Sequence, residues 1–330
     1  MRYRFVSLLK AAFLSLLLAS QVLAEEVELP NGDVYLGDFD GGKRQGLGEY
    51  RWADGQRYVG EFDADEMHGE GEFFWPDGRT YVGEFVRGKR QGKGVFSWPN
   101  GDRYDGDFAN NQMHGTGKFE WSNQDVYQGH FRQGRRTGSG QFRWADGAQY
   151  VGEFADDLLA GRGRYRWVDG REYIGQFLAG NKHGEGALTW PNGNRYEGQF
   201  VNDLRSGAGL FFWRDGTVYR GFFDNGIIIG WGVKQLPEGQ QELQLWAEGT
   251  LVETRVLRAF GHCALSLQGR DWMFESTECV NGKAHGLGMA ASLDGDLLVA
   301  EGRFVLGALV AGEIVELPKR TAPGSSQGGQ

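Results

Sequence analysis

Apolar and polar residues alternate along most of this chain with a period of two, which is the pattern of a β-strand with one covered face. Tyr35, Gly37 and Phe39 fall on one face of a first strand, and Leu36 and Asp38 fall on the other. The next strand returns across a loop at residues 40–45, and the expected cross-strand pairs are Phe39 with Gly46, Gly37 with Gly48, and Tyr35 with Tyr50. The pattern therefore predicts a β-hairpin in which rings meet glycines or other rings.

This hairpin pattern repeats every 23 residues without an insertion or a deletion. The repeat is marked by nine tyrosines: Tyr35, Tyr58, Tyr81, Tyr104, Tyr127, Tyr150, Tyr173, Tyr196 and Tyr219. Each Tyr is followed by Gly two positions later and by Phe four positions later, and then by Gly-x-Gly and, in eight of the nine, by Trp. Such self-similarity predicts a repeat architecture in which each unit contacts only its neighbours. We expect an all-β fold, an elongated single-layer antiparallel sheet of stacked β-hairpins.

The regular glycines have a packing explanation. Gly weakens an ordinary strand, so its fixed use suggests that it leaves room for an aromatic side chain lying across the sheet. Because Trp52 and Tyr58 share a face, the turn between them needs an odd number of residues, and we predict a three-residue loop at 53–55 with Gly55 left-handed. Gln124 stands at the Gly position of one such turn, and Leu236 replaces Trp in another. We expect those two hairpins to be bent or loosened.

The motif Tyr-x-Gly-x-Phe, Gly-x-Gly, Trp-x-Asp-Gly-x-x-Tyr resembles the MORN repeat, over residues 31–239. The resemblance implies a sheet of stacked hairpins used for scaffolding, dimerisation and attachment to membranes. It implies no catalytic chemistry and no cofactor.

Residues 240–318 depart from the repeat and are richer in Leu and Val. Trp246 and Gly249 echo the Trp-to-Gly turn of the repeats, which indicates a divergent, β-rich module that caps the open end of the sheet at 25–239. A separate recognition domain is the alternative. Cys263 and Cys279 lie in this module, and in an exported protein they are expected to form a disulfide. A free pair in a reducing compartment is the alternative. The tail at 319–330 is expected to be disordered.

The amino-terminal segment resembles a secretory signal peptide. Arg2, Arg4 and Lys10 precede an apolar run that is too short to span a membrane, and small residues near Ala24 offer a cleavage point. We therefore expect residues 1–24 to be removed and the protein to be exported to the periplasm or the extracellular space, where it lies free or peripheral to a membrane. Removal changes 35 basic and 44 acidic residues to 32 and 44, which takes the charge from -9 to -12. This acidity argues against a nucleic-acid partner.

The sequence offers no convincing catalytic or metal site. Ser325 and Ser326 lie in a Gly-Ser-Ser-Gln-Gly stretch of the tail, outside any strand-turn-helix context. His68, His114 and His183 occupy one slot of the repeat, but two repeats separate the first pair by ~19 Å, too far to share an ion. We expect no enzyme activity, small-molecule substrate, cofactor or metal.

Basic residues recur before Gly-x-Gly in alternate repeats, in the segment that we expect to be the loop. These residues are Lys43, Arg44, Lys89, Arg90, Arg135, Arg136 and Lys182. One hypothesis is inheritance from duplicated repeats without a function. The other is a ladder of cations ~19 Å apart that meets a polyanion such as a phospholipid surface.

Two functions remain open at this point. The first is an exported, non-enzymatic scaffold that binds another protein or a second copy of itself through its long edge or its aromatic strip. The second is a peripheral module that binds anionic phospholipid or another polyanion through the basic residues.

Overall fold

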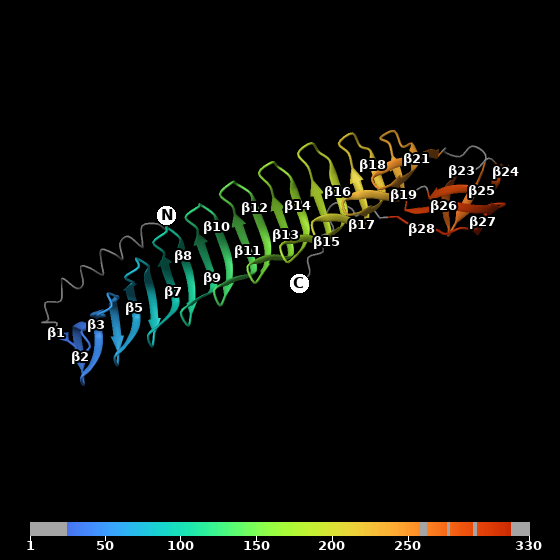
Figure 1. The fold of residues 1–330 in the computed structure, drawn as a ribbon. Coiled ribbons are helices and arrows are strands. Elements are labelled where there is room, and N and C mark those ends of the chain that lie inside the picture. The colour runs from blue at the N-terminus through green and yellow to red at the C-terminus, as the bar shows by residue number, and fades with distance from the viewer. Residues whose placement is uncertain (1–24, 258–262, 276–277, 293–295, 318–330) are drawn as a thin grey trace. The chain divides into compact units, whose positions relative to one another are not determined.

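Every regular element of the described chain is a β-strand. The computed structural model describes residues 25–257, 263–275, 278–292 and 296–317, and no helix occurs among them (Figure 1). The predicted signal peptide at 1–24 and the tail at 319–330 lie outside these residues. Strands β1 to β21 follow one another as an antiparallel meander of hairpins, and a second set, β22 to β28, forms a separate seven-stranded sheet.

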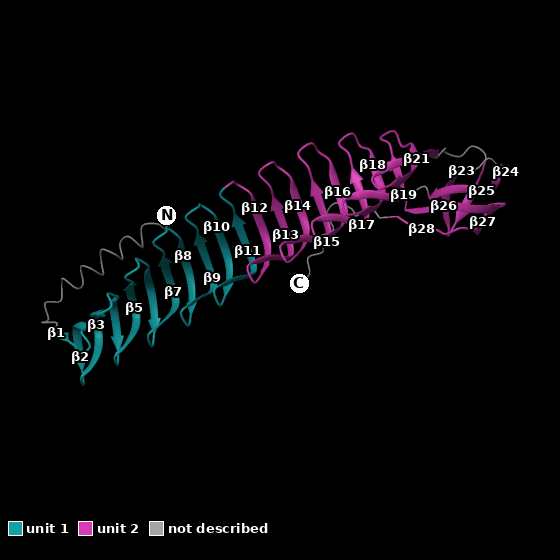
Figure 2. Ribbon diagram, viewed as in Figure 1, with its two compact units in different colours: residues 1–145 teal, residues 146–330 magenta. Residues whose placement is uncertain are grey.

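The chain divides into two compact units, 1–145 and 146–330, and the division falls inside the run of repeats (Figure 2). The described part of unit 1 contains eleven strands: β1 (Glu25–Glu28), β2 (Val34–Asp40), β3 (Lys43–Arg51), β4 (Arg57–Asp63), β5 (Glu66–Phe74), β6 (Thr80–Val86), β7 (Lys89–Ser97), β8 (Arg103–Ala109), β9 (Gln112–Glu120), β10 (Val126–Arg132) and β11 (Arg135–Arg143).

Unit 2 continues the same hairpins and then carries the divergent module. Its hairpin strands are β12 (Gln149–Ala155), β13 (Leu158–Arg166), β14 (Glu172–Leu178), β15 (Asn181–Thr189), β16 (Arg195–Val201), β17 (Leu204–Phe212), β18 (Val218–Asp224), β19 (Ile227–Gln235), β20 (Gln241–Ala247) and β21 (Thr250–Leu257). Because β20 and β21 belong to the long sheet, the divergent module begins later than the expected residue 240. It contains β22 (Leu265–Leu267), β23 (Arg270–Glu275), β24 (Glu278–Val280), β25 (Lys283–Ser292), β26 (Leu297–Val305), β27 (Ala308–Ala311) and β28 (Val315–Glu316).

The register confirms two of the three predicted pairs and corrects the third. Tyr35 lies opposite Tyr50 and Gly37 opposite Gly48, but Phe39 lies opposite Arg44 instead of Gly46. The cause is a β-bulge after Gly37, where Gly46 takes a left-handed φ of 68°. The expected loop at 40–45 is therefore wrong: the turn has only two residues, at 41 and 42, with φ of 57° and 80°. These angles are those of a type I′ turn, the tightest hairpin connection.

The three-residue turn is confirmed. The backbone N–H of Gly55 donates to the carbonyl of Trp52 at 2.9 Å, and Gly55 has a φ of 90°. Gln124 takes the same position with a φ of 76° and donates to Trp121 at 2.9 Å. Leu236 accepts the corresponding bond from Gly239 at 2.9 Å. The expectation that these two hairpins are loosened is therefore wrong, because both keep the hydrogen bonds of the turn.

The divergent module packs on a face of the sheet instead of closing its end. We call the face that carries the repeated tyrosines the inner face and the opposite one the outer face. In unit 2, Val233 and Leu243 of the outer face form a core with Met273 and Leu298 of the module. Arg220 of the outer face adds an ion pair with Asp296 at 3.3 Å. The module therefore covers the outer face at β18 to β20, which corrects the expected position of the cap.

Candidate functional site

The inner face is built around one fully buried tyrosine in each repeat. The ring of Tyr58 lies over Gly60 and Gly71, so that a Cβ atom placed on Gly71 would be 2.5 Å from the ring. The Tyr58 hydroxyl donates to the carbonyl of Glu61 at 2.9 Å. Its ring meets Phe62 of its own hairpin and Phe85 of the next one edge-to-face, each with ring centroids 5.1 Å apart. Edge-to-face contact is a favoured arrangement for aromatic pairs, so each tyrosine connects two hairpins.

The tyrosine hydroxyls are held in the protonated form. Burial raises the pKa of Tyr35 to about 12, with a smaller contribution in the same direction from the Asp38 carboxylate. Burial is also the largest cause of the raised pKa of Tyr58 and Tyr81. The hydroxyls therefore act as hydrogen-bond donors to the backbone near neutral pH.

A second aromatic row on the inner face remains half-buried. In unit 1, tryptophan alternates with the ring of the following hairpin: Trp52 to Phe73 at 5.3 Å, Phe73 to Trp75 at 4.4 Å, and Trp75 to Phe96 at 5.3 Å. The row continues in the same way through Trp98, Phe119, Trp121, Phe142 and Trp144. The phenylalanines of the row are buried, whereas Trp52 and Trp75 are only partly buried. We call Trp52, Trp75, Trp98, Trp121 and Trp144 the tryptophan row.

The predicted basic residues lie in strands, because the turn before them is shorter than expected. Lys43, Lys89 and Arg135 are the first residues of β3, β7 and β11, and their side chains are exposed. Arg44, Arg90, Arg136 and Lys182 are second residues of their strands and are partly buried on the inner face. The structure thus separates the seven residues into an exposed set of three and an inward set of four.

The inward basic residues rest on aromatic rings and connect neighbouring turns. The Arg90 guanidinium carbon lies 4.9 Å from the Phe96 ring centroid and 5.6 Å from that of Trp75. Arg90 also donates to the carbonyl of Asn111 in the next turn at 2.8 Å. Burial lowers the pKa of Arg90, which nonetheless stays charged because arginine titrates far above neutral pH.

Other repeats use this inward position in the same manner. Arg44 bonds to Asp65, and Lys182 pairs with Asp203 at 2.8 Å. Arg205 was not among the predicted basic residues. It lies over the rings of Tyr196, Phe211 and Phe223 and donates to the carbonyl of Gly226. Its position, two residues before a left-handed Gly207, was the available signal.

The repeated histidines do not form a metal site. His68, His114 and His183 lie in β5, β9 and β15, each next to the bulge of its own strand. Over the described residues, no group of three His, Cys, Asp or Glu side chains is arranged to hold a metal ion.

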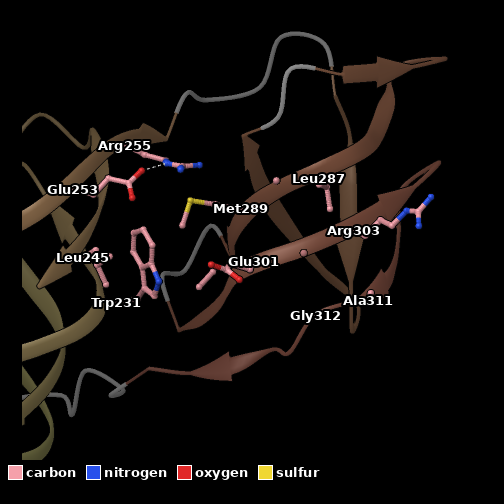
Figure 3. A pocket seen from close by; sticks show the side chains of 13 residues that line it. Trp231, Leu245, Glu253, Arg255, Leu287, Met289, Glu301, Arg303, Ala311 and Gly312 are labelled. Carbon is pink, nitrogen blue, oxygen red and sulfur yellow. Dashed lines mark hydrogen bonds and ion pairs between the residues drawn. The ribbon is translucent and has the colours of Figure 1, made fainter. Parts of the chain in front are cut away.

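One cavity in unit 2 lies between the sheet and the divergent module (Figure 3). It has a volume of about 550 Å³ and is lined by apolar side chains that include Trp231, Leu245 and Met289. Its polar lining comes from Glu253 and Arg255, which are paired, together with Glu301 and Arg303. A smaller cavity of about 400 Å³ lies on the outer face between Val151 and Ile174.

The two cysteines of the module are joined. Cys263 and Cys279 form a disulfide with their Cα atoms 5.6 Å apart, a usual separation for this bond. The bond ties the start of the module to β24.

Comparison with known families identifies the hairpins. The family model of the MORN repeat matches eight segments: 35–57, 58–78, 81–103, 104–126, 127–149, 150–170, 173–195 and 196–218. Together they cover more than half of the chain. The chain belongs to the MORN repeat family. MORN repeats commonly serve as interaction or membrane-binding modules. Beyond the matched segments, β18 and β19 form a further hairpin with the register of this MORN array, and β20 and β21 form one whose bulge leaves a single residue unpaired, between Glu253 and Leu251.

Solved structures resemble this MORN protein only weakly. The SAS-4 (dCPAP) TCP domain of Drosophila melanogaster, solved in complex with a proline-rich motif of Ana2 (dSTIL), is 10% identical; the match covers 55% of this chain and 93% of that chain, with a TM-score of 0.32. An E1021V mutant of the TCP10 domain of Danio rerio CPAP is 13% identical, with 70% and 98% covered and a TM-score of 0.25. A virginiamycin B lyase from Staphylococcus aureus is 12% identical, with 92% and 87% covered and a TM-score of 0.14. At such scores these likenesses carry no argument. No curated protein matches the sequence.

Among the described residues, none belongs to a helix with the length and apolar character needed to cross a membrane.

Proposed function

We propose that this MORN protein is an exported, non-enzymatic scaffold that holds another protein, or a second copy of itself, on its inner face. The observation that carries the proposal is the tryptophan row. In unit 1 its five indoles alternate with the buried phenylalanine rings of successive hairpins and remain partly exposed. Tryptophan is enriched among the residues that dominate binding energy at protein interfaces, so a continuous row of partly exposed indoles is suited to binding a partner.

A structural use of the reactive side chains supports the non-enzymatic part of the proposal. The tyrosine hydroxyls donate to backbone carbonyls, as Tyr104 does to Asp107 at 2.9 Å. The inward arginines bond to neighbouring turns, as Arg44 does to Asp65. These hydroxyls and guanidinium groups thus have a structural role in the hairpins where they form such bonds.

Two features support export. One is the charged, then apolar, then small-residue pattern of residues 1–24. The other is the bond between Cys263 and Cys279, because disulfides persist mainly in oxidising compartments.

The test is a crosslinking capture from cell-envelope extract with the mature chain and with a Trp75→Leu, Trp98→Leu variant. Leu is a suitable replacement because Leu236 occupies the same slot and keeps the turn hydrogen bonds. We expect both proteins to have the same circular dichroism and the variant to lose its captured partner. A Val168→Gln variant, changed at a side chain that is 62% exposed, serves as the control. A mature chain that sediments as a monomer and captures nothing dependent on these tryptophans would contradict the proposal.

A second candidate function is binding to anionic phospholipid, and the exposed set of basic residues favours it. Lys43, Lys89 and Arg135 recur at alternate hairpins of unit 1, about 19 Å apart. We expect sedimentation with phosphatidylglycerol vesicles at low salt and its loss at 0.5 M salt, because exposed charges are screened there. Reversing Lys43 and Lys89 to Glu leaves the inward set in place and removes binding if the hypothesis is right. Unchanged binding of this variant would reject it.

A further inference from the structure

The outer face of unit 2 exposes a row of aliphatic side chains beside the two-residue turns. Each hairpin ends in a last cross-strand pair before its turn, and in unit 2 these pairs are Ala155 with Leu158, Leu178 with Asn181, Val201 with Leu204, Asp224 with Ile227, and Ala247 with Thr250. The large members are exposed to 49% at Leu158, 58% at Leu178, 46% at Val201, 46% at Leu204 and 43% at Ile227. We call these five residues the turn-end row.

Two members of the row contact the neighbouring turn. A Cβ atom built on Gly226 would lie 3.8 Å from a methyl group of Leu204, and one built on Gly249 would lie 3.4 Å from the Cβ atom of Ile227. Leu204 and Ile227 therefore each pack against the glycine of the next turn, whereas a Cβ atom built on Gly180, in the turn after Leu158, would meet nothing within 4 Å.

Unit 1 shows that the fold does not require apolar residues at these positions. Its corresponding pairs are Asp40 with Lys43, Asp63 with Glu66, Val86 with Lys89, Ala109 with Gln112, and Arg132 with Arg135. Val86 is the one large aliphatic residue among these ten. The same hairpins with the same type of turn thus form with charged or polar pairs, and the turn-end row needs another explanation than stability of the fold.

The surroundings of the row are acidic. The four-residue segments at 155–158, 178–181, 201–204, 224–227 and 247–250 contain five carboxylates and no Lys or Arg; the carboxylates belong to Asp156, Asp157, Asp203, Asp224 and Glu248. Asp203 is paired with Lys182 of the inner face at 2.8 Å. On the outer face of β13 the basic residues begin at Arg162, four positions beyond Leu158. Asp224 lies opposite Ile227 on the outer face, so a partner that lies along the row meets apolar groups with a carboxylate beside them.

The dimensions of the row suit one helix. From Leu158 on β13 to Ile227 on β19 there are six strand spacings, or about 29 Å. An α-helix of about 19 residues has that length. The same face already binds an apolar surface within the chain, because Phe222, Val233 and Leu243 pack against the divergent module next to the row.

We propose that the turn-end row is the docking surface for an amphipathic helix of about 19 residues in a partner protein, with an apolar stripe bordered by Lys and Arg. The inference rests on the proposed scaffold function and adds to it a second surface and the chemistry of its partner. The acidic border disfavours an anionic membrane, and it disfavours a second copy that would bring its own row to the same place, since like charges would then face each other.

The experiment uses the mature full-length chain and two synthetic, fluorescein-labelled 19-residue helical peptides. Both carry the same leucine stripe, and the flanking positions are all Lys in one peptide and all Glu in the other. Binding is measured by fluorescence anisotropy at 0.15 M salt. We expect the Lys peptide to bind at least ten-fold more tightly than the Glu peptide.

A matched pair of variants assigns the binding to the row. The test variant carries Leu158→Gln, Leu204→Gln and Ile227→Gln, because Gln112 occupies the same position in unit 1. The control variant carries Val168→Gln, Val252→Gln and Val310→Gln, at side chains exposed to 62%, 60% and 55% that lie outside the row. The test variant should weaken Lys-peptide binding at least ten-fold, and the control variant should leave it within two-fold.

Several results would overturn the proposal. Equal affinity for the two peptides, or unchanged binding by the test variant, would show that the turn-end row does not bind a basic amphipathic helix. A dimer in sedimentation velocity that the test variant dissociates would assign the row to a second copy. Flotation with phosphatidylglycerol vesicles that the test variant abolishes would assign it to a bilayer. If the peptide test fails while the tryptophan-dependent capture succeeds, the scaffold function stands without this surface.

Discussion

The glycines beneath the buried tyrosines should be irreplaceable, and Gly71→Ala is the sharpest test. A Cβ atom at position 71 would lie 2.5 Å from both Cε2 and Oη of Tyr58, far inside van der Waals contact. The ring has no room to move, because it also covers Gly60, where a Cβ atom would be 2.4 Å from the same hydroxyl. Overpacking of a close-packed site costs about 1–3 kcal/mol, and a trapped ring with a backbone hydrogen bond favours the upper end, about 3 kcal/mol.

The assay is urea unfolding followed by tryptophan fluorescence, with hydrogen exchange to locate the loss in β4 and β5. Gly41→Ala is the control, because its Cβ atom would meet nothing within 4 Å and only its φ of 57° is unfavourable, at about 1–2 kcal/mol. In a Tyr58→Ala background, Gly71→Ala should cost almost nothing, since the clash is gone. An equal cost for the two glycines, or an undiminished cost in that background, would refute the packing explanation.

Three further predictions concern other contacts. Hydrogen bonds from Tyr50 and then from a backbone N–H lower the pKa of Asp33. The carboxylate of Asp33 therefore stabilises the fold above its ordinary pKa of about 3.9, and this stabilisation is lost as the pH falls through the lower pKa of the folded state. The difference in Tm between the wild type and Asp33→Ala should accordingly shrink below about pH 4. Cys263→Ser should lower the stability of the divergent module by about 3 kcal/mol, because the disulfide joins residues 16 positions apart. Thermal melting with and without reductant tests this prediction. An identical response of the wild type and the variant to reductant would contradict it. Arg90→Met should change the free energy of unfolding by less than about 1 kcal/mol, because Met67 occupies the same slot in the preceding hairpin; a larger loss in urea unfolding would show that the charge is required.

The inner face was predictable because packing allows only one type of residue at each of its repeated positions. Tyr58 needs two glycines beneath its ring, and the next hairpin must supply a phenylalanine at a fixed distance. Such requirements recur in every repeat and so appear in the sequence as a strict spacing. The three-residue turn followed from the parity of Trp52 and Tyr58 alone, and the structure has it.

The two-residue turn was not predicted, and the reason is the bulge. Counting from Phe39 to Gly46 as a simple alternation assumes that no residue is left unpaired, but Gly46 and Leu47 lack partners on β2. The Gly-Gly pair at 41 and 42 was the missed signal, since both residues take left-handed φ there. The error placed Lys43 and Arg44 in a loop, whereas the strand gives them opposite faces and so different environments.

The position of the divergent module could not be predicted from the sequence. Outer-face positions hold apolar residues in the middle repeats, such as Val151 and Ile174, as well as in the last hairpins, where Phe222, Val233 and Leu243 lie. The apolar character of one face therefore does not mark the surface that the module covers. Its partner strands could not be assigned from the sequence, because residues 240–318 have lost the spacing that fixes register elsewhere.

In a repeat array, positions with the same residue in every hairpin are explained by the needs of folding. Positions that vary between hairpins are open to selection for binding. Arg90 and Met67 alternate in a slot that both can fill by packing on rings, so that variation is tolerated by the fold. Leu204 and Lys43 also occupy the same position of the repeat, but Leu204 exposes an apolar surface to solvent and Lys43 a charged one. Only the apolar surface is unfavourable in water. An exposed apolar feature that lowers solubility, and without which the hairpins of unit 1 still form, is best explained by a partner that covers it, which is why the turn-end row and its acidic border identify a docking surface.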